Sequence, residues 1–258
     1  MNLQLKNKNA LVCGSTQGIG KATAIALAAE GANVTLIARN EEKLKAVLEE
    51  LPNHDQHHYY LVADFTNPED LKTKLQALTI KYHILINNTG GPAGGPIFNA
   101  KLEEFERAFT MHLKCNHVLV QLMVPRMKEL NYGRIINVIS TSVKQPLDGL
   151  GVSNTIRGAV ANWSKTMANE LGQFGITVNN VLPGATETER LNEIIQNKAN
   201  KTGKSTDEIS QSMKNASPAK RFAKPEETAA AITFLASEKA SFINGINLPV
   251  DGGRTKSL

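Results

Sequence analysis

The fold is decided by one short stretch, Gly14-Ser15-Thr16-Gln17-Gly18-Ile19-Gly20. It follows an apolar run at 10–13 that is typical of a β-strand, and it leads directly into a helical segment near 18–31. Glycines at such a junction let the chain turn tightly, let backbone N–H groups approach a pyrophosphate, and let the helix pack closely on a sheet. Any strand-to-helix turn can use glycine, so the spacing alone leaves a purely structural turn open.

Strand-like and helical segments alternate along nearly the whole chain. This rhythm predicts an α/β fold, because parallel strands need crossover helices that cover both faces of the sheet. We predict a Rossmann-type, doubly wound, parallel seven-stranded sheet with helices on both faces, in a single domain at 1–258. The polar stretch 187–217 interrupts the rhythm and is predicted to be a lid over the carboxyl edge of the sheet. Further strands are expected at 33–38, 59–63, 84–87, 134–139, 177–181 and 247–250, and further helices near 40–50, 68–79, 101–130, 150–173 and 225–237.

Composition excludes several classes of protein. Hydrophobic residues make up 41% and charged residues 21% of the 258 residues, which is ordinary globular usage and unlike a disordered chain. The two cysteines, Cys13 and Cys115, form neither a disulfide framework nor a zinc site built from cysteines. The net charge of +5 is spread along the chain, so nucleic-acid binding is not implied. Long apolar runs and a signal peptide are both missing, so we expect a cytoplasmic protein that does not bind membranes.

Five patterns together carry a resemblance to a known family. They are the glycine turn at 14–20, Asp64-Phe65, Asn87-Asn88-Thr89-Gly90, Val181-Leu182-Pro183-Gly184 and Pro249-Val250-Asp251-Gly252-Gly253. Over essentially its whole length the chain resembles the short-chain dehydrogenase/reductase (SDR) family, and it is similar to the members that act as 3-oxoacyl-carrier-protein reductases. The resemblance implies an oxidoreductase that uses a nicotinamide dinucleotide and acts on a small-molecule carbonyl or alcohol substrate.

The resemblance also implies which residues contact the cofactor. Asp64 would bond the adenine amino group, and the strand end at Asn87 and Gly90 would line the ribose. The backbone after Pro183 would meet the nicotinamide amide. Thr89 stands where the family usually has alanine, which is a small change. The cofactor-binding residues implied in this way are Gly14, Ser15, Thr16, Gln17, Gly18, Ile19, Gly20, Asp64, Phe65, Asn87, Gly90, Pro183, Gly184, Thr186 and Thr188.

The end of the second predicted strand decides between the two nicotinamide cofactors. An acidic residue there would accept the ribose 2′-hydroxyl. Ala38 stands in its place, and Arg39 beside it provides a bidentate cationic partner for a 2′-phosphate. NADP(H) is therefore the predicted cofactor. The alternative is that Arg39 only begins a solvated helix, and Gln17, where NADP-specific relatives often carry a base, gives Arg39 no support.

The catalytic tetrad of the family is largely replaced. Relatives use an Asn on the long central helix, a Ser at the end of the fifth strand, and a Tyr-x-x-x-Lys on the next helix. Ser140 fills the Ser position, whereas Ser153 and Arg157 stand in the Tyr and Lys positions, and His112 takes the Asn position. A serine hydroxyl is a much weaker acid than tyrosine, and an arginine stays charged and does not readily relay protons. The ordinary proton path is therefore broken.

The roles of these replacements remain open at this point. An imidazole has an ordinary pKa near neutrality, so His112 can be a replacement acid, or else a core histidine that bonds a strand carbonyl or an internal water. Asn116, one turn later, can take over the Asn role. Ser140 is either a hydroxyl that binds the substrate carbonyl or a strand-end cap. Where the resemblance fails locally, Arg157 is a surface cation.

Three hypotheses about function follow. The first is an NADP(H)-dependent oxidoreductase with atypical proton delivery, and it is preferred because the cofactor contacts are complete. The second is an NADP(H)-binding homologue without catalysis, such as a sensor. The third is an inactive scaffold subunit that works with another chain. The resemblance also implies a homotetramer or homodimer that assembles through the helices at 101–130 and 150–173 and through the C-terminal strand and helix.

Overall fold

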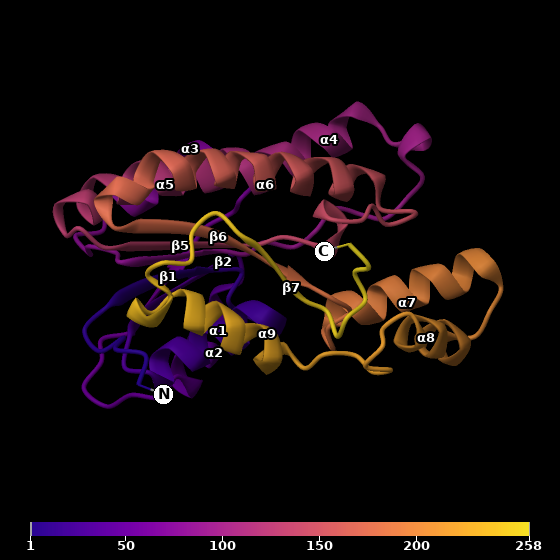
Figure 1. Ribbon diagram of the computed structural model, residues 1–258, viewed down its shortest axis with the longest axis horizontal. Helices are drawn as coiled ribbons and strands as arrows, with labels where there is room; N and C mark the ends of the chain where they lie inside the picture. Colours follow the sequence, from indigo (N-terminus) through magenta and orange to yellow (C-terminus); the bar gives the residue numbers. More distant parts are fainter. Residues whose placement is uncertain (1, 258) are drawn as a thin grey trace.

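The computed structural model describes residues 2–257 and shows a seven-stranded parallel sheet between two layers of helices (Figure 1). Its strand order is β3-β2-β1-β4-β5-β6-β7, with every neighbouring pair parallel. The predicted doubly wound Rossmann-type fold is confirmed. The strands are β1 Asn9–Cys13, β2 Asn33–Ala38, β3 Tyr59–Val62, β4 Ile84–Asn87, β5 Gly133–Val138, β6 Ile176–Pro183 and β7 Asn247–Val250.

The helices cover both faces of the sheet and bury its central strands. One layer holds α1 (Gly18–Ala29), α2 (Glu41–Glu50) and α9 (Pro225–Leu235). The other layer holds α3 (Pro68–Gln76), α4 (Leu102–Phe109), α5 (Cys115–Glu129) and α6 (Gly151–Leu171). Strands buried on both faces are mostly apolar, which explains the near-continuous apolar runs in the sequence.

Local sequence signals set several of the helix starts. Asn40 caps α2 by accepting a hydrogen bond from the Lys43 N–H at 2.8 Å, and Asn67 caps α3 by accepting from the Asp70 N–H at 3.1 Å. Both helices carry acidic residues in their first turn, where the positive end of the helix dipole favours them. α1 has neither a capping side-chain hydrogen bond nor an acidic residue in its first turn.

The order in which successive strands are added to the sheet changes direction between the neighbouring strands β1 and β4. β1 pairs with β2 on one side and with β4 on the other, so the loops that follow β1 and β4 leave in opposite directions. In sheets of this kind a crevice forms outside the carboxyl ends of the strands at such a point. The glycine turn follows β1, and the Asn88-Thr89-Gly90 segment follows β4.

The single long helix expected at 101–130 is wrong in one respect. A π-helical turn at Thr110–Lys114 separates α4 from α5. A π turn takes up an extra residue, so the faces of the two helices fall out of step with a regular helical repeat. Phe109 is consequently 38% exposed, whereas His112 and Asn116 are buried. Such turns often occur at functional sites.

Four asparagines cross the sheet side by side. Asn87, Asn137, Asn180 and Asn247 are register partners on β4, β5, β6 and β7. Each side-chain amide donates to the next carbonyl oxygen, at 2.8 Å, 3.1 Å and 2.8 Å in turn. The Asn137 amide also donates to the hydroxyl of Ser164 on α6 at 2.9 Å. This amide ladder satisfies polar groups that would otherwise be buried without partners.

The stretch 187–217 forms two helices that project beyond the carboxyl ends of the strands (Figure 1). α7 is Glu189–Thr202 and α8 is Thr206–Asn215, and they are separated at the predicted Thr202-Gly203 break. Gly203 ends α7 with φ +70°, a left-handed conformation that glycine adopts readily. A small apolar cluster joins the two helices: Leu191, Ile195, Ala199, Ile209 and Phe222. The position of this pair suits a lid, and its movement remains a prediction.

No helix in the described chain, residues 2–257, is both long enough and apolar enough to cross a bilayer.

Candidate functional site

The glycine turn is built so tightly that side chains are excluded from it. Gly14 and Gly18 have φ of +58° and +53°. A Cβ on Gly20 would lie 2.2 Å from the Gly14 carbonyl oxygen. The Asn88 amide lies against the same turn, 3.2 Å from the Cys13 carbonyl and 3.3 Å from that of Gly14. The sequence alone predicts no role for Asn88, because its position beside the turn depends on the pairing of β1 with β4.

The N-terminus of α1 is open toward the crevice and fits an anionic group. Gln17, at the cap position, is extended and makes no side-chain capping bond, and the first turn holds no acidic residue. The first N–H groups of the helix therefore lack a side-chain acceptor, and the positive end of the helix dipole is not offset locally. Ser15 is buried beneath the turn, with its hydroxyl directed at the Ile37 carbonyl, so it supports the turn from below. The arrangement suits a pyrophosphate.

The segment that follows β6 lies against the glycine turn. A Cβ on Gly18 would lie 2.9 Å from the Thr188 methyl carbon, so the glycine turn and this segment are in contact. The Thr186 hydroxyl donates to the Gly184 carbonyl at 3.1 Å, and Thr188 caps α7. Gly184 packs against the tail, since a Cβ there would lie 2.7 Å from the Cα of Asp251. The Pro183–Thr188 and 249–253 patterns thus form one substructure.

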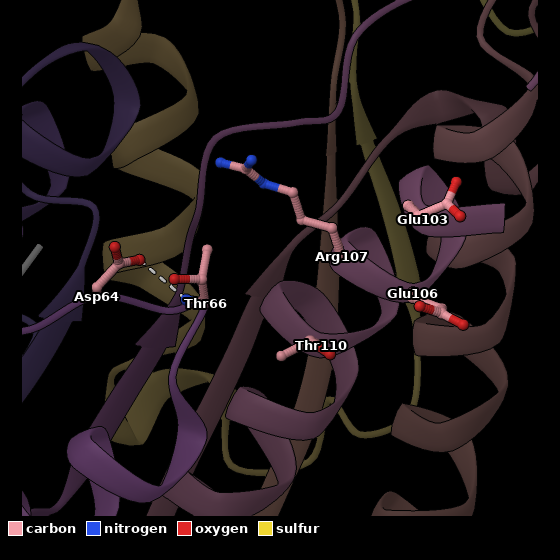
Figure 2. A pocket seen from close by; sticks show the side chains of 6 residues that line it. All are labelled: Asp64, Thr66, Glu103, Glu106, Arg107 and Thr110. Atoms are coloured by element: carbon pink, nitrogen blue, oxygen red, sulfur yellow. Dashed lines mark hydrogen bonds between the residues drawn. The ribbon is translucent and has the colours of Figure 1, made fainter. Parts of the chain in front are cut away.

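A pocket of about 410 Å³ lies beside Asp64, between the end of β3 and α4 (Figure 2). The Asp64 carboxylate accepts the Thr66 N–H at 2.9 Å, and the Arg107 side chain extends into the space facing it. Phe65 is buried in the core, so only its backbone reaches the surface here. The other residues that line the pocket are Glu103, Glu106 and Thr110.

Two predicted cofactor residues take different positions relative to the sheet. Arg39 is exposed directly after β2 ends, one residue before the Asn40 cap of α2, so its guanidinium is free to meet a phosphate. Asn87 is buried in the amide ladder, and its Oδ1 has no hydrogen-bond partner among the described residues. A ribose contact at Asn87 would therefore use the backbone. Gly90, three residues on, is exposed.

Ser140 lies two residues after the end of β5 and acts as a cap. Its Oγ accepts the Ser142 N–H at 3.1 Å, which starts a short helical turn at Thr141–Val143. The hydroxyl proton takes no part in this bond and remains available to a carbonyl oxygen. The two roles predicted for Ser140 are therefore compatible.

Ser153 and Arg157 lie on successive turns of α6, and Arg157 is not a surface cation. Ser153 is half-buried, whereas Arg157 is only 7% exposed. Its Nη1 donates to the Val138 carbonyl at 3.1 Å. Burial, and then the nearby charge of Arg190, lower the pKa of Arg157 to about 10. Arg157 therefore remains charged at neutral pH and is no proton relay.

His112 sits in the π turn as a buried, neutral imidazole. It is 2% exposed, and its Nδ1 shares a 2.6 Å hydrogen bond with the Thr89 hydroxyl. Its Nε2 is buried without a partner among residues 2–257. Burial, and then the charge of Arg157, lower the pKa of His112 to about 2. Of the two roles left open for His112, this environment favours the core histidine over the replacement acid, because the ring is desolvated beside a cation. The Thr89 contact was missed, since Thr89 looked like a neutral replacement for alanine.

His112 should make the fold sensitive to acid. Its pKa is lower in the folded chain than in the unfolded chain, so the unfolded state binds more protons between about pH 2 and 6.5. The stabilisation that neutral His112 contributes is fully present above about pH 6.5 and decreases as the pH falls below that value. The free energy of unfolding of the wild type should fall by up to about 1.4 kcal/mol per pH unit more than that of His112→Gln. Urea unfolding between pH 5 and 6.5 measures this difference.

The matched control for that experiment is His57→Gln, which replaces an exposed histidine. It should follow the wild-type pH profile. Identical slopes for the wild type and His112→Gln would mean that His112 is accessible to solvent in solution, contrary to the structure.

The carboxyl edge of the sheet thus gathers most of the predicted site residues. The glycine turn, Arg39 and the Pro183–Thr188 segment all lie at the carboxyl ends of β1, β2 and β6, where a crevice for a dinucleotide is expected in sheets of this kind. The charge of Arg157 acts on the His112 ring, and both side chains adjoin the loop at 89–91. Within residues 2–257 no group of three or more His, Cys, Asp or Glu is placed to hold a metal ion.

Comparisons with known proteins agree with this geometry. Residues 14–255 match the family described as Enoyl-(Acyl carrier protein) reductase. The NADPH-dependent reductase BacG of Bacillus subtilis is 30% identical over 259 residues, covering 98% of this chain and 100% of BacG. The 3-oxoacyl-[acyl-carrier-protein] reductase FabG of Staphylococcus epidermidis is 30% identical over 253 residues, which cover 96% of this chain and 98% of FabG. The L-sorbose reductase of Gluconobacter frateurii, solved with NADPH and L-sorbose, superposes with a TM-score of 0.92 at 30% identity and full coverage of both chains.

Proposed function

The chain belongs to the short-chain dehydrogenase/reductase family, and we propose that it is an NADP(H)-dependent oxidoreductase that interconverts a carbonyl compound and an alcohol. The observation that carries this proposal is the open N-terminus of α1 above the glycine turn. Its N–H groups have no capping side chain, and a Cβ at Gly20 could not be accommodated. A homologue that no longer bound a dinucleotide would need neither the uncapped helix N-terminus nor the tightly packed glycine turn.

The choice of NADP(H) rests on charge at the end of β2. Ala38 presents no carboxylate to repel a 2′-phosphate, and the exposed Arg39 follows it directly. Arginine binds phosphate in a bidentate manner. BacG is described as NADPH-dependent, and the L-sorbose reductase structure contains NADPH. These observations support the same cofactor for this chain.

The residues around the reacting centre support an unusual proton delivery. The bound cofactor supplies or accepts hydride. Ser140 can direct its free hydroxyl proton at the substrate oxygen, as a hydrogen-bond donor. Ser153 is too short and too weakly acidic to replace a tyrosine, and His112 is neutral with its pKa near 2. We therefore infer that the proton comes from water, while Ser140 orients the substrate oxygen.

The second candidate is an NADP(H)-binding protein without catalysis, either a sensor or a scaffold subunit. The observation in its favour is that neither Ser153 nor Arg157 can transfer a proton at neutral pH in the way that the family's Tyr and Lys do. Tight NADPH binding together with no turnover on any carbonyl compound would place this candidate ahead of the enzyme.

Cofactor binding is tested by thermal unfolding with NADPH and NADH at equal concentrations. NADPH at about 100 times its Kd should stabilise the fold by about 2.7 kcal/mol, a rise in Tm of roughly 5–11 °C. NADH should give a clearly smaller rise, because it lacks the 2′-phosphate that Arg39 would bind. An equal or larger shift with NADH would contradict the assignment of NADP(H), and no shift with either cofactor would remove the proposed function.

Assembly into a homotetramer or homodimer is proposed from exposed apolar side chains. Phe98 is 96% exposed and Leu102 is 75% exposed, and both lie at the start of the α4 region. Two large apolar side chains exposed four positions apart support an apolar contact surface at this point. Light scattering at micromolar concentration should give two or four times the mass of one chain. A monomer would instead favour association with a different chain.

A further inference from the structure

Arg157 is a buried cation without a counter-ion. One of its nitrogens, Nη1, is bonded to the Val138 carbonyl at 3.1 Å, and its remaining donors make no hydrogen bond within residues 2–257. No carboxylate of the described chain forms an ion pair with it. A buried charge is costly unless an opposite charge accompanies it. The structure therefore leaves the guanidinium in need of an anion.

A second arginine lies beside the same loop. Arg190, near the start of α7, donates from Nη2 to the Pro92 carbonyl at 2.6 Å and from Nη1 to Glu193 at 3.1 Å. Arg157 reaches the preceding residue, since a Cβ on Gly91 would lie 3.8 Å from its Nη2. Both guanidinium groups thus adjoin Gly91 and Pro92, and the charge of Arg190 lowers the pKa of Arg157. Glu193 offsets only Arg190, so an excess positive charge remains.

A neutral ligand would not compensate the excess positive charge of Arg157 and Arg190. Ribose hydroxyls or a ketone oxygen can accept a hydrogen bond from Arg157, but they bring no negative charge. The neighbouring His112 is neutral and adds none. A carboxylate supplies the missing charge and matches the planar donors of a guanidinium. Glycine at position 91 leaves the approach to Nη2 free of a side chain.

We propose that Arg157, with Arg190 beside it, binds a carboxylate of the substrate, so that this protein acts on carbonyl compounds that carry a carboxylate group. The inference rests on the proposed function and specifies its substrate class. Arg157 would bind the carboxylate directly. Arg190 would add positive charge from the edge of α7 and hold the Pro92 loop in place.

The test is equilibrium binding to protein saturated with NADP⁺, which cannot reduce a ketone. Calorimetric titration would compare three pairs of an acid and its ester: acetoacetate and methyl acetoacetate, 4-oxopentanoate and its methyl ester, and 4-phenyl-2-oxobutanoate and its ethyl ester. In at least one pair the acid should bind about 10- to 100-fold more tightly than the ester, as expected of a charge-assisted hydrogen bond. Arg157→Met should reduce this ratio to about one, whereas Arg157→Lys should retain part of it.

Arg126→Gln on α5 is the matched control, because it removes a charge far from this loop and should leave the ratio unchanged. Saturation of each variant with NADP⁺ shows that it is folded. The absence of an acid preference in all three pairs, or its survival in Arg157→Met, would overturn the inference while the proposed function stood. Failure of the wild type to bind NADP⁺ at all would overturn both.

Discussion

Ser153→Tyr combined with Arg157→Lys should raise the NADPH-dependent reduction of a simple uncharged ketone by about 10²- to 10⁴-fold, the usual contribution of general acid catalysis. The wild type should reduce such a ketone poorly. A tyrosine on α6 regains a phenol, and an ammonium one turn later makes that phenol more acidic. Loss of NADPH absorbance in steady state measures the gain.

The single variants separate the two contributions. Ser153→Tyr alone places a phenol beside the buried guanidinium of Arg157, which also favours the phenolate, so it should recover part of the activity. Arg157→Lys alone should recover almost none, because no acid is present. Rapid NADPH-dependent reduction of the ketone by the wild type would contradict the premise that the family's route of proton transfer is missing. His112→Ala would then be examined, and little change is expected because the imidazole is already neutral.

Arg39→Asp should reverse the preference between the two cofactors. The substitution removes the bidentate partner of the 2′-phosphate and puts a repelling carboxylate in its place, which can instead accept the ribose 2′-hydroxyl of NADH. NADPH affinity should fall by about 100-fold or more, whereas NADH affinity should rise or stay level. Fluorescence titration of each reduced cofactor gives both dissociation constants.

The control for Arg39→Asp is Arg126→Asp, which makes the same change of charge on α5, away from the crevice. It should leave both affinities within about twofold, since charges separated by more than a Debye length are largely screened. A retained preference for NADPH in Arg39→Asp would show that Arg39 only precedes the capped helix α2.

The strands and the glycine turn could be predicted because their signals are local. Apolar runs, glycine spacing and the Thr202-Gly203 break each act over a few residues, and the structure places all three as expected. The π turn could not be predicted, because its extra residue changes no local propensity. His112 lies in this turn, and its burial beside Arg157 of α6 depends on a contact between distant segments that local patterns do not show.

The contacts of Asn88, Thr89 and Arg190 depend on segments that are distant in sequence. Thr89 meets His112 across 23 positions, and Arg190 meets Pro92 across 98. Single-sequence patterns carry no information about such pairs until the strand order is known. Arg157 illustrates the same limit, since its charge and its place on α6 can be predicted from the sequence but its lack of a counter-ion cannot.

The amide ladder gives the site a mechanical property. A one-residue slip moves every side chain of a strand to the other face of the sheet, and the four paired amides add polar contacts that are made only in the observed register. Asn87 belongs to this chain, and the next two residues, Asn88 and Thr89, hold the glycine turn and His112. Any slippage of β4 would therefore displace the cofactor turn and the imidazole together. The ladder ties the geometry of the crevice to strands as far away as β7, so the cofactor side and the carboxyl-terminal side of the sheet should open as one cooperative unit.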